Sequence, residues 1–124
     1  MPTATWIPSP GEVVYADVQY SNSEQTKSRF AVVVSSKRFN AQYPDVIVAY
    51  ATRSSKVKFA QAYDVAIPKE HREFRRTGLP LPTTVRCGRL WSLDKRSVRH
   101  VAGVVPADLF CGIIRLVREC FAES

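Results

Sequence analysis

Apolar residues along this chain come in short runs separated by polar stretches, a pattern typical of strands. One such run lies in residues 30–35, where Ala-Val-Val-Val gives four consecutive apolar residues, three of them β-branched. Such a run predicts a short strand that is buried on both faces. Further strands are expected at residues 13–18, 45–52, 62–67 and 98–105. Residues 83–87 and 90–93 are expected to form one more strand, interrupted by a bulge at Gly88.

The stretches between these runs are polar and differ in length. Residues 1–10 contain three prolines and are expected to form an extended lead-in. Residues 19–28 are almost wholly polar and too long for a tight turn, so we expect a mobile loop of the kind that often carries function. Residues 37–43 predict one helical turn, stopped by the proline that follows. The charged run at residues 69–76 predicts a short exposed helix.

A terminal helix is predicted to begin at Pro106. Proline suits the first helical position, and Asp108 favours the positive end of the helix dipole. Apolar residues then follow at helical spacing and form a broad stripe, so we expect this helix to be buried on more than one side. The stripe comprises Leu109, Ile113, Leu116, Val117 and Cys120, widened by Phe110, Ile114 and Phe121.

Together these elements predict a mainly β, α+β fold in a single domain, residues 1–124. Five or six short strands followed by one helix indicate a small twisted barrel, or a half-open sheet closed by that helix. No apolar run approaches the roughly 20 residues of a membrane helix, and the N-terminus has none of the features of a signal peptide. The three cysteines lack metal-ligand spacing, which favours free thiols in a cytoplasmic protein.

The charge of the chain is concentrated in its middle. The formal net charge is +7, but residues 1–26 carry −3, residues 27–99 carry +11 and residues 100–124 carry −1. A concentrated positive field favours a polyanionic partner such as nucleic acid. A basic surface that serves only solubility is the alternative that composition leaves open.

The candidate chemistry rests on four features that would meet if the second, third and fifth strands were neighbours. An arginine, a hydroxyl and a carboxylate at one edge suit a phosphodiester, and an exposed aromatic ring can stack on an unpaired base. Each feature also has an ordinary structural explanation, as a strand end, a β-former or a core residue. Neither His71 nor His100 stands out as a general base, because packed or solvated histidines are commoner. The four features are Ser23-Glu24-Gln25 with Arg29, Thr52 with Arg53, Arg86 with Cys87, and Trp91.

The order of these motifs resembles the PemK/MazF family of toxin endoribonucleases over nearly the whole chain. Each motif is short, but they occur in the family's order without large gaps. The similar segments are Gly11-Glu-Val-Val-Tyr-Ala-Asp17, Ser23-Glu-Gln-Thr-Lys-Ser-Arg29, Val46-Ile-Val-Ala-Tyr-Ala-Thr52, Val85-Arg-Cys87 with Leu93-Asp-Lys95, and Val101-Ala-Gly103 before the Pro106 helix.

The resemblance implies an SH3-like barrel that pairs into a homodimer and cuts single-stranded RNA without a metal or other cofactor. A cognate antitoxin would cover the RNA groove with a disordered segment that folds on binding. Carried over by position, Arg29 and Thr52 would be the main catalytic residues, with Glu24 beside them and Arg86 as in one branch of the family. The residues expected to bind RNA around them are Gln25, Lys27, Arg53, Lys56, Lys58, Arg89 and Trp91.

Some positions depart from the family pattern and keep an alternative open. Phe30 stands where proline is usual, Gly88 and Arg89 stand where Asp-Gln is common, and Trp91 stands where arginine is common. The alternative is a relative of the same fold that binds nucleic acid without cutting it, or that targets gyrase as CcdB-like toxins do. CcdB-like toxins use a tryptophan near the C-terminus, and this chain has none after Trp91.

Overall fold

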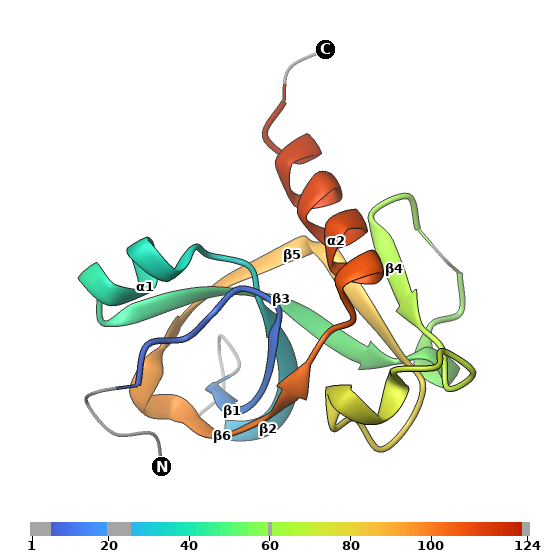
Figure 1. Cartoon of the computed structure of the whole chain (residues 1–124), viewed down its shortest axis with the longest axis horizontal. Coiled ribbons are helices and arrows are strands. Elements are labelled where there is room, and N and C mark those ends of the chain that lie inside the picture. The colour runs from blue at the N-terminus through green and yellow to red at the C-terminus, as the bar shows by residue number, and fades with distance from the viewer. Residues whose placement is uncertain (1–5, 20–25, 60, 123–124) are drawn as a thin grey trace.

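The computed structural model describes residues 6–19, 26–59 and 61–122. Its strands form one antiparallel sheet in the order β4-β5-β3-β2-β1-β6, strongly curved and accompanied by two helices (Figure 1). The predicted α+β fold with a C-terminal helix is confirmed, with a half-open sheet whose described ends are β4 and β6. The elements are β1 (Glu12–Gln19), β2 (Thr26–Val33), α1 (Lys37–Gln42), β3 (Asp45–Arg53), β4 (Asp64–Ile67), β5 (Thr83–Asp94), β6 (Val98–Val104) and α2 (Ala107–Glu119).

The strand β2 lies near the middle of the sheet, and its last residues, 31–33, are buried on both faces, as predicted. Successive strand residues point to opposite faces, so β2 contributes to two separate apolar cores. Val32 joins the core that contains Ile113 of α2, whereas Ala31 and Val33 join the core on the other face. Because both faces of β2 are packed, its register is fixed, and the residues at its N-terminal end are held by a rigid strand.

The long strand β5 is bent at its middle, which confirms the bulge expected at Gly88. Ala49 of β3 pairs with Leu90, but the next residue, Tyr50, pairs with Arg86. Residues 87–89 therefore leave the β3 ladder, and the backbone N–H of Cys87 donates instead to the carbonyl oxygen of Tyr63. The bend lets residues 83–86 pair with β3 on one side and β4 on the other.

The connection between β4 and β5 differs from prediction. The expected helix over residues 69–76 is replaced by turns and one 3-10 turn, Phe74–Thr77. Gly78 ends this turn with φ 69°, and a side chain at Gly103 of β6 would collide with the carbonyl oxygen of Arg76. Backbone therefore packs directly on backbone here, and the two glycines hold residues 79–82 against the sheet.

Two further expectations are corrected. The polar stretch 19–28 is a shorter connection than expected, because Gln19 and Thr26 already pair in the β1–β2 ladder. The helix α2 buries only Ile113 completely, and Phe121 beyond its end is 73% exposed, so burial on more than one side is not found. In the part of the chain that is described, neither helix is long and apolar enough to cross a membrane.

Candidate functional site

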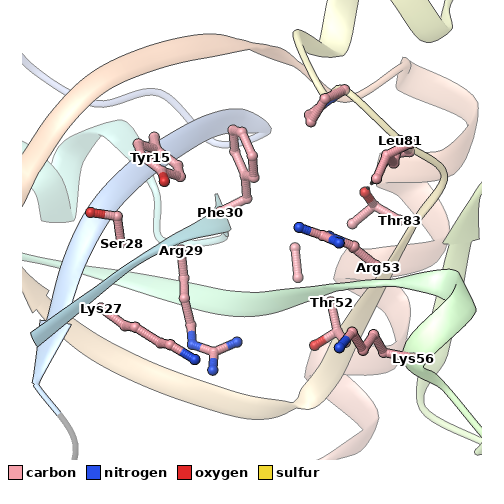
Figure 2. A pocket seen from close by; sticks show the side chains of 12 residues that line it. Tyr15, Lys27, Ser28, Arg29, Phe30, Thr52, Arg53, Lys56, Leu81 and Thr83 are labelled. Atoms are coloured by element: carbon pink, nitrogen blue, oxygen red, sulfur yellow. Dashed lines mark hydrogen bonds between the residues drawn. The ribbon is translucent and has the colours of Figure 1, made fainter.

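A cavity opens where β2 and β3 part from each other. The two strands pair only through three residues each, from Ala31 opposite Tyr50 to Val33 opposite Val48. Beyond that ladder the start of β2 stays with β1, and the end of β3 stays with β5. The side chains along the separated segments surround a cavity of about 430 Å³ (Figure 2). Its lining residues are Tyr15, Lys27, Ser28, Arg29, Phe30, Ala51, Thr52, Arg53, Lys56, Pro80, Leu81 and Thr83.

The alternation of side chains along the strands gives this cavity two chemically different sides. Lys27 and Arg29 extend from β2 to the side on which Thr52 and Lys56 lie (Figure 2). Phe30, the next residue along β2, points to the opposite side. The described lining residues include four cations and no carboxylate. The cationic side can therefore attract and orient a phosphate, with guanidinium, ammonium and hydroxyl donors.

The other side is built mainly by Phe30, Tyr15 and the wall of residues 80–83, and the Arg53 side chain also lies on it, near Thr83 (Figure 2). Hydrogen bonds fix that wall, since the Thr83 hydroxyl donates to the carbonyl oxygen of Leu81 at 2.8 Å. The backbone N–H of Ser54 donates to the carbonyl oxygen of Pro82 at 3.0 Å. The end of β3 and the wall are thus tied together.

Arg86 lies outside the cavity, in an ion pair with Asp64 of β4. Its Nε atom is 2.8 Å from Asp64 Oδ1, and the two side chains are 14% and 7% exposed. Its neighbour Cys87 is fully buried, and burial is the main cause that raises the pKa of this thiol to about 11, with smaller contributions from Cys120 and Asp64. A thiol with so high a pKa is a poor nucleophile at neutral pH.

Neither histidine is among the residues that line the cavity. His71 Nε2 lies 3.0 Å from Asp108 at the start of α2, and hydrogen bonding to His71 lowers the pKa of the Asp108 carboxyl. His100 on β6 is exposed and lies beside Tyr15. Among the described residues, no group of three or more His, Cys, Asp and Glu side chains is arranged to hold a metal ion.

Comparison with known proteins decides the family. A family model described as PemK-like, MazF-like toxin of type II toxin–antitoxin system matches residues 9–121. The chain belongs to this family. Comparison with curated protein sequences found no match.

Solved structures of PemK/MazF-like proteins share the fold. An endoribonuclease in complex with its cognate antitoxin from Mycobacterial species is 18% identical, with a TM-score of 0.71 over 91% of this chain and 93% of that one. MazF from Deinococcus radiodurans is 22% identical, with a TM-score of 0.70 over 92% of this chain and 96% of that one. At this identity the likeness establishes the fold, and the site must be argued from this chain's own residues.

The residues predicted for a PemK/MazF-like site divide into three groups. Arg29 and Thr52 line the same cavity. Glu24 and Gln25 lie outside the described residues, so their roles stay predictions. Three of the expected RNA-binding residues line the cavity: Lys27, Arg53 and Lys56. Three others lie outside it: Lys58, Arg89 and Trp91.

The prediction missed the aromatic side of the cavity. Tyr15 and Phe30 are directly opposite each other in the β1–β2 ladder, with ring centroids 4.7 Å apart. Two aromatic residues on adjacent strands were visible in the sequence, but their pairing depends on the register. Trp91, which was expected to offer a stacking face, instead packs on Tyr50 with ring centroids 5.8 Å apart and is 39% exposed.

Proposed function

We propose that this PemK/MazF-like toxin is an endoribonuclease that cleaves single-stranded RNA at the cavity between β2 and β3. The observation that carries the proposal is the shared cavity of Arg29 and Thr52, with Lys27 and Lys56 on the same side. Structures named as endoribonucleases have this fold, which favours cleavage over the gyrase-targeting and binding-only alternatives.

The proposed reaction is attack by the ribose 2′-OH on the adjacent phosphorus. The new P–O bond closes a 2′,3′-cyclic phosphate while the bond to the 5′-oxygen breaks, and that oxygen takes up a proton as it leaves. Arg29 stabilises the charge that builds on the non-bridging oxygens, and the Thr52 hydroxyl donates to one of them and keeps the phosphate in line. Arginine stays protonated at neutral pH, so its role is electrostatic. Glu24 is proposed as the base that accepts the 2′-OH proton.

RNA binding is proposed to depend on the basic residues around the cavity. Lys27, Arg53 and Lys56 would neutralise phosphates that flank the reacting one. Each single-strand phosphate contact contributes about −0.7 to the slope of log affinity against log salt concentration. Lys27, Arg53 and Lys56 together are therefore expected to contribute about −2 to the slope of log affinity against log salt concentration, in addition to the contribution of any other phosphate contact.

The proposed partners are a second copy of the chain and a cognate antitoxin. A matched structure is named as a complex with its cognate antitoxin, and others from Deinococcus radiodurans are named MazE-MazF. We propose that an acidic antitoxin segment covers the cationic side of the cavity, because the chain carries a net charge of +7. RNA and antitoxin would then compete for the same cations.

The test is incubation of the purified protein with a long unstructured RNA in EDTA, followed by mapping of the cut ends. Arg29→Ala should remain folded and cleave about 100- to 1,000-fold more slowly, because it removes one preorganised donor. Thr52→Val should also slow cleavage while preserving the β-branched shape of the side chain. The matched control is Arg38→Ala, which removes an exposed arginine from α1 and should cleave as the parent does. Equal cleavage by Arg29→Ala and the parent would contradict the assignment, and RNA retardation without cuts would support the binding-only alternative.

A further inference from the structure

Three rings lie in a row across three neighbouring strands. Tyr15 of β1 is directly opposite Phe30 of β2 on one side and His100 of β6 on the other. The ring centroids are 4.7 Å apart for Tyr15 and Phe30, and 5.4 Å apart for Tyr15 and His100. We call Phe30, Tyr15 and His100 the aromatic row.

The aromatic row begins in the cavity and ends at the solvent. Phe30 and Tyr15 line the cavity, on the opposite side of β2 from Lys27 and Arg29 (Figure 2). His100 is exposed on β6, an end strand of the described sheet. Packing against the apolar core accounts for Phe30, but it does not account for an exposed ring at the far end of the row.

A nucleotide has the same division into two chemical parts as this cavity. Its phosphate is anionic and suits the cationic side, whereas its base is a flat ring that stacks on aromatic side chains. Stacking requires only a π face, so an aromatic surface accepts any of the four bases. Adjacent strands bring the three rings side by side, with tilts of 50° and 35° between the planes of neighbouring rings.

We propose that the aromatic row binds the bases of the nucleotides beside the phosphate that Arg29 holds, and that it guides single-stranded RNA from the cavity across β1 to β6. This inference rests on the proposed endoribonuclease function. It adds a base-binding surface whose contribution to affinity is stacking and is therefore nearly independent of salt, in contrast to the contribution of the lysines.

The experiment measures binding of a fluorescein-labelled 2′-O-methyl RNA oligomer by fluorescence anisotropy at a series of KCl concentrations. This RNA lacks the 2′-OH nucleophile and so remains uncut. His100→Ala and Tyr15→Leu should each weaken binding, His100→Ala by at least about 5-fold and Tyr15→Leu by up to about 150-fold. Their salt slopes should equal that of the parent, whereas Lys27→Gln should reduce the slope by about 0.7.

The matched control is Tyr43→Ala, which removes a ring that is 52% exposed and packs on Phe39 with a centroid distance of 4.7 Å. It should bind RNA as the parent does. Unchanged affinity in His100→Ala would overturn the aromatic row as a binding surface, even if Tyr15→Leu were unstable. A reduced salt slope in His100→Ala would overturn it too, because the contact would then be electrostatic.

The same variants separate this inference from the proposed function. If the parent cuts RNA in EDTA and His100→Ala both binds and cuts equally well, the aromatic row fails while the endoribonuclease stands. If the parent binds RNA without cutting and His100→Ala weakens that binding, the endoribonuclease fails while the aromatic row stands.

Discussion

The ion pair between Arg86 and Asp64 allows a sharp test of whether Arg86 acts in stability or in catalysis. Replacing Arg86 with methionine keeps most of the aliphatic stem but removes the cation beside the Asp64 carboxylate, which is only 7% exposed and keeps one hydrogen bond, from the backbone N–H of Gln61 at 2.9 Å. Breaking a fully buried pair costs about 3–5 kcal/mol, and the 14% exposure of Arg86 lets some water in, so we expect a loss of about 2–4 kcal/mol. For a chain of this size about 1 kcal/mol shifts Tm by roughly 4 °C, which predicts a fall of about 8–16 °C.

The assay combines thermal and denaturant unfolding of Arg86→Met, Asp64→Asn and the double variant with RNA cleavage well below each Tm. The double variant should lose less stability than the sum of the two single losses, by about 0.5–3 kcal/mol. The reason is that both charges are removed together, so neither is left without its partner. Cleavage per folded molecule should stay within a few-fold of the parent, since Arg86 lies outside the cavity. If Arg86 instead contacts the reacting phosphate, cleavage should fall about 100- to 1,000-fold. A stability loss below about 1 kcal/mol, or strict additivity in the double variant, would refute the reasoning.

Two further predictions concern packing and thiol chemistry. Gly103→Ala should destabilise the protein by about 3 kcal/mol or more, because the added methyl group meets the backbone of Arg76. Gly112→Ala in α2 has free space around the added methyl group and should stabilise the protein by about 0.5–1 kcal/mol. Urea unfolding measures both, and similar stability of the two variants would contradict the close approach. Cys87, whose pKa is raised to about 11, should carry about 0.1% thiolate at pH 8 and should therefore resist a disulfide reagent in the native protein. Cys111 is exposed and should react with the same reagent. Comparable labelling of both thiols, read by mass spectrometry, would show that Cys87 is accessible.

The strands and the terminal helix could be predicted because each has a local cause. The apolar run in β2 occupies consecutive positions and is rich in β-branched residues, and a strand packed on both faces buries all of it. The bulge at Gly88 likewise follows from a residue without a side chain inside a strand pattern. The charged run 69–76 failed as a helix because its conformation depends on a distant partner, Gly103.

The sequence by itself determined which side chains the middle strands carry: a basic central segment, an arginine in β2 and a threonine near the end of β3. Only the tertiary structure decided which of these side chains share a cavity, because that depends on where β2 and β3 part. The partner of Arg86 and the row formed by Phe30, Tyr15 and His100 depend in the same way on strand register. Local sequence sets the conformation of a strand, but its neighbours and its register come from the packing of the whole sheet.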